Sequence, residues 1–175
     1  RRRQRQMCIR DRIANRGAFV HETTLAEVRN LYDLRGAIFA MACASSARRV
    51  AEGAEPKLVR QLEKNLERMR KTQDDSDAAT YYTLNIEFHD MLLEGAGNPR
   101  AKAMYDNMVK EMHLFRRRGL SIATNIARSL DEHRDITDAV AAGNPDGARA
   151  AAERHITSGF ARYMKIVEQD DSGNG

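Results

Sequence analysis

Cysteine and proline are scarce in this sequence, and it has no long apolar run. Two cysteines, Cys8 and Cys43, are too few for a disulfide scaffold and favour a reducing cytoplasm. Three prolines and eleven glycines beside 42% hydrophobic residues indicate a folded core rather than a disordered chain. The longest apolar run, residues 37–44, is too short to cross a bilayer, and no apolar segment of a secretory signal follows the basic start. We therefore expect a cytoplasmic protein that does not enter a membrane.

The excess of positive charge is confined to the start of the chain. Residues 1–12 hold six arginines and one aspartate, so the remaining residues carry 23 basic and 24 acidic side chains and a net charge of −1. We interpret residues 1–12 as a basic tail that resembles vector-derived sequence, with a phosphate-binding arm as the less favoured alternative. The charge of the remaining chain gives no argument for a nucleic-acid partner.

From Leu25 onward, apolar residues recur at three- and four-residue steps, and almost no strand pattern is present. Thr24 and Glu27 have the spacing of a capping box before the first helix. Breaks near residues 53–56, 73–77, 95–99, 119–121 and 143–145 separate six expected helices. The predicted fold is all-α, an antiparallel bundle of about six helices over residues 23–168, with residues 169–175 frayed.

The apolar stripes predict which faces point inward. For the first helix the stripe consists of Leu25, Val28, Leu31, Leu34, Ile38 and Met41. For the fourth helix it consists of Met104, Met108, Met112 and Phe115, and the fifth begins its stripe with Ile122.

Three histidines lie on the apolar stripes of three different helices. They are His89, His133 and His155, and Asn85 stands one turn before His89 on the same face. Three imidazoles and one side-chain oxygen on rigid helices can hold a divalent metal ion and leave positions open for water or a small anion. Alternatively, each histidine is an ordinary core residue bonded to a carbonyl or to water. Spacing alone leaves both interpretations open.

Several segments together resemble the FCD domain, the C-terminal effector-binding domain of FadR-type regulators in the GntR family. They are residues 85–89 (NIEFH) followed by Asn98-Pro99, Leu34-Arg35, and Glu132-His133-Arg134 with His155 following 22 residues after His133. The resemblance covers about residues 24–167. Residues 15–20 (NRGAFV) are similar to the last strand of that family's winged-helix domain. The resemblance implies that residues 13–22 are a remnant of this domain and its linker, that the rest of it is missing, and that DNA is bound only through the missing part.

For the site, the resemblance implies one metal ion in the bundle, held by one carboxylate and three histidines. His89, His133 and His155 match, whereas Asn85 replaces the carboxylate with a neutral and weaker ligand. We expect zinc, with nickel or iron as alternatives, and either a reduced affinity or a position completed by water or by the effector. Asp90 is turned about 100° away on the helix and is a poor substitute. Some members of the family hold no metal.

A neutral ligand set around a divalent cation leaves a positive pocket, which favours a small carboxylate effector. We expect Arg35 to clamp a second carboxylate or to stiffen the site, the alternative being an ion pair elsewhere. Tyr82, Asn98 and Tyr163 are expected wall residues.

The expected function is an effector-sensing domain of a GntR/FadR-type transcriptional regulator that works as a homodimer. A metal-dependent hydrolase is the rival, but the sequence places no general base beside the histidines, and we expect no enzyme activity. A metal-free helical dimerisation module is the third alternative.

Overall fold

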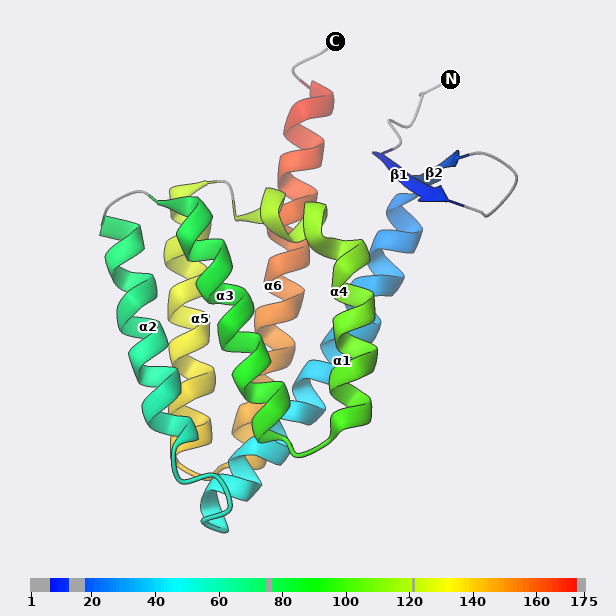
Figure 1. Ribbon diagram of the computed structural model, residues 1–175. Coiled ribbons are helices and arrows are strands. Elements are labelled where there is room, and N and C mark those ends of the chain that lie inside the picture. The colour runs from blue at the N-terminus through cyan, green and yellow to red at the C-terminus, as the bar shows by residue number, and fades with distance from the viewer. Residues whose placement is uncertain (1–6, 13–17, 75–76, 121, 173–175) are drawn as a thin grey trace.

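The computed structural model describes residues 7–12, 18–74, 77–120 and 122–172 (Figure 1). Within these ranges a two-stranded hairpin precedes six helices. The elements are β1 (Met7–Arg12), β2 (Ala18–Thr23), α1 (Leu25–Ala51), α2 (Leu58–Asp74), α3 (Ala78–Gly95), α4 (Pro99–Gly119), α5 (Ala123–Ala141) and α6 (Pro145–Ser172). The expected all-α bundle is confirmed from residue 25 onward.

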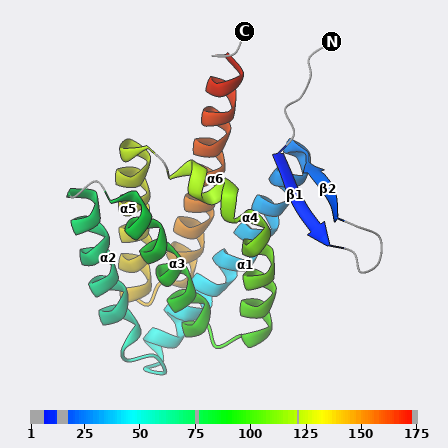
Figure 2. The same ribbon diagram turned by 45° about the horizontal axis from the view of Figure 1, so that its top comes forward.

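The hairpin lies at the N-terminal end of α1 (Figure 2). β1 and β2 pair antiparallel, with Met7 opposite Thr23 and Arg12 opposite Ala18. β2 covers residues 18–20 of the segment that resembles the last strand of a wing, whereas β1 was not expected within the basic tail. Two assignments stay predictions: residues 13–22 as a winged-helix remnant, and residues 1–12 as a vector-derived tail. Residues 1–6, 13–17 and 173–175 lie outside the described ranges.

The helices alternate in direction, so that the start of α1 and the end of α6 lie at the same end of the bundle (Figure 1). α6 lies against α1, α4 and α5, and α3 lies between α2 and α4. The last turns of α4 bend across the upper end of the bundle in the view of Figure 1. A Cβ added at Gly119, in that bend, would lie 3.7 Å from the carbonyl oxygen of Gly159 on α6. The end of α4 is therefore held directly over α6.

α1 presents a different face to the bundle from the one its leucines predict. Leu34 is 50% exposed and Leu25 is 38% exposed, so both of these predictions are wrong. The buried side instead carries Tyr32, Arg35, Phe39, Ala42, Cys43, Ser46 and Ala47. Small side chains let the backbone of α1 approach its neighbours closely: the Ser46 hydroxyl donates to the Leu92 carbonyl at 2.7 Å. Close approach of backbones, rather than the bulk of the leucines, thus determines how α1 is rotated.

The other stripes are largely confirmed. Met108, Met112 and Phe115 are buried, but Met104 is 59% exposed and Ile122 is 42% exposed, contrary to prediction. Ile122 is the N-cap residue of α5, outside the first turn, whereas Met104 lies beside the buried face of α4 that Ala101, Tyr105 and Met108 form. Among the described residues, no helix combines the length and the apolar character that crossing a bilayer requires.

The helix ends follow local chemistry. The capping box of Thr24 and Glu27 is present, and Asn98 accepts a hydrogen bond from the Ala101 amide ahead of Pro99. α2 begins two residues after Pro56, and α6 continues to Ser172, beyond the residue 168 at which it was expected to fray.

Gly143 and Gly53 provide a matched pair for testing the turn before α6. Both have left-handed φ angles, +61° and +73°, but a Cβ at Gly143 would lie 2.8 Å from the Cβ of Ala51, whereas at Gly53 nothing lies within 4 Å. We expect Gly53→Ala to lower the free energy of unfolding by about 1 kcal/mol, the cost of the backbone conformation. Gly143→Ala should cost about 1–3 kcal/mol more because of the overlap. Urea denaturation measures both, and equal losses would contradict the packing of this turn against α1.

Candidate metal centre

Three histidine rings meet inside the bundle. His89 on α3, His133 on α5 and His155 on α6 are 1%, 0% and 4% exposed, and one ring nitrogen of each lies within 4.8 Å of the others. The stripes on the three helices therefore converge as predicted. A set of three nitrogens at this spacing can hold one metal ion. Whether this chain binds one is a separate matter and stays a prediction.

Glu132 fixes the orientation of the His155 ring. The Nδ1–H of His155 donates to Oε2 of Glu132 at 2.8 Å, and Arg162 donates to both carboxylate oxygens at 2.7 and 2.9 Å. Burial works to raise the pKa of Glu132, but the hydrogen bonds from His155 and Arg162 outweigh it and lower that pKa to about 2. Because the ionised carboxylate holds the proton on Nδ1, the Nε2 lone pair of His155 faces the other two rings.

A chain of hydrogen bonds continues from His155 to Arg35. Nε2 of His89 lies 3.2 Å from Nε2 of His155, and since His155 carries its proton on Nδ1, His89 is the donor. Nδ1 of His89 then accepts from the Tyr105 hydroxyl at 3.0 Å, and that hydroxyl accepts from Nε–H of Arg35 at 2.9 Å. A metal ion would replace the hydrogen bond between His89 and His155. It would need the Nε2 lone pairs of both rings, whereas here Nε2 of His89 carries the proton that it donates to Nε2 of His155.

His133 makes no hydrogen bond to any residue that the structure describes. Neither of its ring nitrogens has a partner there, although the side chain is fully buried and packs on the Phe88 ring at a centroid distance of 4.3 Å. An unsatisfied buried polar group costs about 1–3 kcal/mol, and such groups are rare in folded proteins. The donor set therefore fits a metal ion, which would take up this free nitrogen together with its two neighbours.

All three rings are neutral near pH 7. Burial lowers the pKa of His89 and of His133 well below the ordinary range, with positively charged or histidine neighbours adding to the shift. For His155 burial lowers the pKa to about 4 although Glu132 works in the opposite direction. Neutral imidazole is the form that binds metals.

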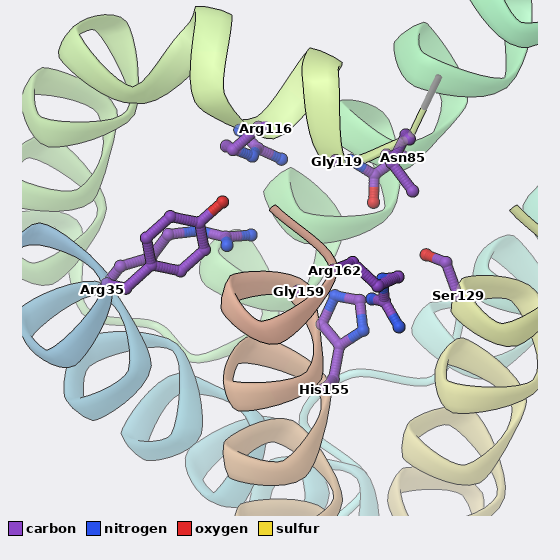
Figure 3. Close-up of a pocket in the computed structure, with 10 residues that line it drawn as sticks. Arg35, Asn85, Arg116, Gly119, Ser129, His155, Gly159 and Arg162 are labelled. Carbon is purple, nitrogen blue, oxygen red and sulfur yellow. The ribbon is translucent and has the colours of Figure 1, made fainter. Parts of the chain in front are cut away.

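A pocket opens beside the histidines (Figure 3). The pocket is partly open to the outside, and the space between its lining residues amounts to about 320 Å³ when open solvent is included. The residues that line it are Tyr32, Arg35, Asn85, Arg116, Gly119, Leu120, Ser129, His155, Gly159 and Arg162. Three arginines against the single carboxylate of Glu132 make its surroundings positive.

The structure divides the predicted pocket residues into two groups. Asn85, Arg35 and His155 line the pocket, and Asn85 makes no side-chain hydrogen bond to a described residue. Asn98, by contrast, is exposed because its side chain caps α4.

Two tyrosines predicted as wall residues also fall outside the lining. Tyr82 contacts His113 through its hydroxyl and lies with its ring 5.8 Å from the guanidinium carbon of Arg116. Tyr163 packs edge-on against Phe115. None of these residues lines this pocket, and a role of Tyr82, Asn98 or Tyr163 in effector binding stays a prediction.

The sequence analysis did not identify four residues of the site: Glu132, Arg162, Tyr105 and Arg116. Glu132 points away from His133 along α5, yet its side chain reaches across to α6. Arg162 stands seven residues after His155, two turns along the same face, and that spacing was a signal that could have found it. Arg116 stands four residues after Met112 and Tyr105 stands three residues before Met108, so the predicted stripe of this helix was a signal for both.

Residues 30–158 match the FCD domain family. The chain belongs to this family. The HTH-type transcriptional repressor RspR of Escherichia coli (strain K12) is 26% identical to it over 157 residues, covering 90% of this chain and 67% of RspR. The galactonate operon transcriptional repressor of the same strain is 26% identical over 83% of this chain and 58% of its own length. The HTH-type transcriptional repressor NanR of Cronobacter sakazakii is 30% identical, over 73% of this chain and 49% of NanR.

This FCD chain thus spans between half and two thirds of the length of these relatives. E. coli McbR/YncC has the same fold, with a TM-score of 0.70 at 18% identity over 90% of this chain and 76% of that one. Streptococcus agalactiae GntR gives a TM-score of 0.62 at 20% identity, over 88% and 74%. The family is regulatory and its named members are transcriptional regulators, so the hydrolase alternative is set aside.

The buried histidines predict that the metal-free protein loses stability in mild acid. Below pH 6.5 the unfolded chain protonates His155, whereas the folded chain keeps it neutral down to about pH 4. The free energy of unfolding should therefore fall by about 2 kcal/mol between pH 7.5 and pH 5 from this residue alone. His89 and His133 add to the loss in the same direction, and the contribution of Glu132 is lost only below about pH 4.5.

Urea denaturation in the presence of a chelator, at pH 7.5, 6 and 5, measures this loss. A free energy of unfolding that stays constant over that range would contradict neutral, buried histidines.

Proposed function

We propose that this FCD domain senses a small carboxylate effector at a divalent metal ion held by His89, His133 and His155. The observation that carries the proposal is His133, a fully buried ring with two unpaired nitrogens in contact distance of two further imidazoles. A metal-free dimerisation module gives no reason to keep such a ring in the core. The regulatory character of the family supports the sensing role.

Zinc is the proposed ion, with nickel and iron as alternatives, because neutral imidazole suits all three. Asn85 is the proposed fourth protein ligand through its amide oxygen. The ion would supply a positive charge and open coordination positions for an anion. Glu132 holds the His155 ring, and Arg162 holds Glu132, so this chain orients at least one ligand before any ion arrives.

The charge around the pocket supports an acidic ligand. None of the three proposed histidine ligands is negative, and the pocket is lined by Arg35, Arg116 and Arg162. An ion of charge +2 therefore keeps its charge, and a carboxylate is the small ligand that both the ion and guanidinium groups bind well.

In a regulator that carries a winged-helix domain beside this one, effector binding would act on DNA through that domain. The pocket is built from α1, α3, α4, α5 and α6, so a ligand that fits one packing of these helices better than another would shift the equilibrium between them. We further propose a cytoplasmic homodimer. The exposed Leu34 on α1 and Met104 on the adjacent α4 support a contact between two copies.

Asn85→Asp tests the ligand set. The carboxylate would add a negative charge beside the ion, so we expect the affinity for zinc to rise at least about tenfold, which corresponds to about 1.4 kcal/mol. Competition against a zinc-binding dye measures the affinity. Asn98→Asp is the matched control, because it makes the same change at an exposed helix cap away from the pocket. Equal affinities in the wild type and in both variants would contradict a role of Asn85 at the ion.

Effector binding is tested by titrating the zinc-loaded and the chelator-treated chain with a panel of small carboxylates in a calorimeter. We expect binding that depends on zinc and that weakens at least tenfold in His133→Ala. A carboxylate that binds equally well after all metal has been removed would show that coordination plays no part.

A further inference from the structure

Two buried arginines of the pocket lack an acidic partner. Arg35 is 4% exposed and donates to Tyr105, with His89 nearby, and Arg116 is 6% exposed and has no hydrogen-bond partner for its Nη2. Neither forms an ion pair with a described carboxylate, whereas Arg162, similarly buried, binds Glu132 through both terminal nitrogens. The pocket thus holds two guanidinium charges that nothing in the described chain neutralises.

Two buried guanidinium groups without a counter-charge lower the stability of the ligand-free fold. Moving an ion out of water costs several kcal/mol unless a counter-charge and hydrogen bonds compensate for it. Burial lowers the pKa of Arg116, and the nearby charge of Arg35 lowers it further. An anion at this place would remove both penalties.

Aromatic rings hold the two guanidinium groups in position. The guanidinium carbon of Arg116 lies 5.8 Å from the Tyr82 ring centre, and that of Arg35 lies 5.9 Å from the Tyr32 ring centre. These contacts are favourable for a cation but do not neutralise it. Tyr82 therefore has a role behind the pocket surface, which it does not itself line.

The pair lies within reach of the metal centre. Nη2 of Arg35 is 3.5 Å from Nε2 of His89, and both arginines line the same pocket as His155. Figure 3 shows Arg35 and Arg116 on one side of this pocket, with Asn85, Ser129 and Arg162 on the other. A small molecule in this pocket can therefore contact His155 and the two guanidinium groups together, and His89 lies directly beside Arg35.

We propose that Arg35 and Arg116 form a subsite for a second acidic group, so that the effector is a short dicarboxylic acid. One carboxylate would bind at the histidine centre and the other between the two guanidinium groups, whose planar donors match carboxylate geometry. This inference rests on the proposed function, and it adds Arg116 as a residue that determines specificity for a dianion.

The test compares acids that differ in one group. Zinc-loaded protein is titrated in a calorimeter with malonate, succinate and glutarate, and with propionate, butyrate and pentanoate of the same chain lengths. We expect the best dicarboxylate to bind at least about thirtyfold more tightly than its monocarboxylate, as an added charge-assisted hydrogen-bond pair of about 2 kcal/mol predicts.

Arg116→Gln should remove most of this preference and change the monocarboxylate affinity by less than threefold. Arg117→Gln is the matched control, because it removes the same charge from the neighbouring, exposed position. Thermal unfolding of the ligand-free variants serves as the check on folding: Arg116→Gln should be as stable as the wild type or more stable, since it removes a buried, unpaired charge. A ligand-free Arg116→Gln clearly less stable than Arg117→Gln would overturn the claim that this charge lacks a partner.

The outcomes separate the two proposals. Equal binding of both acid classes, with no effect of Arg116→Gln, overturns the subsite and leaves the proposed function standing. A dicarboxylate preference that depends on Arg116 but persists without zinc supports the subsite and contradicts the metal role. Failure of every acid to bind the zinc-loaded chain overturns both.

Discussion

The pairing of Glu132 with His155 and Arg162 is the interaction on which the interior of this bundle depends. It brings a carboxylate into a region that otherwise carries three imidazoles and three guanidinium groups, and it links α5 to α6 through hydrogen bonds of 2.7–2.9 Å. Removing one partner of a buried pair leaves an uncompensated charge, which typically costs about 3–5 kcal/mol. The same carboxylate decides which nitrogen of His155 carries its proton, and through that the direction of the hydrogen bonds to His89 and Tyr105.

The packing of the helices positions the other side chains of the site. Three helices each place one histidine on their inner face, and the small residues of α1 let that helix approach closely enough for Arg35 to reach the Tyr105 hydroxyl. Arg116, in the last turns of α4, lines the same pocket (Figure 3). What results is a pocket with several cations and few anions, an imbalance that the proposed acidic ligand would offset.

Helical periodicity was enough to predict the bundle and to place three histidines on inner faces. It could not show that the three rings meet, because that depends on the level at which each helix packs against the others. Periodicity predicted the wrong buried face for α1. The leucines are the most hydrophobic residues of that helix, but its face of small residues packs more closely against the neighbouring helices and is the buried one. Periodicity also did not predict the role of Glu132. The direction of its side chain was inferred from α5 alone, whereas its hydrogen-bond partners lie on α6.

The stripe of α4 also indicates which of its three consecutive arginines is buried. Residues 116–118 point in three directions about 100° apart, and only Arg116 stands four residues after Met112 on the inward side. The stripe could not show that Arg116 and Arg35 line one pocket, because they belong to different helices. Asn98 does not line the pocket, because a residue before a helix-starting proline is well placed to cap the helix, and its side chain does so here.

Anomalous X-ray scattering from crystals grown without added metal, recorded at the absorption edges of zinc, nickel and iron, tests the central claim most directly. The account predicts a single peak with a nitrogen of His89, His133 and His155 each about 2.0–2.1 Å away, as in zinc–histidine sites. It would be contradicted by crystals without a peak even after soaking in zinc, in which His89 still donates to His155 and His133 has found a protein or water partner.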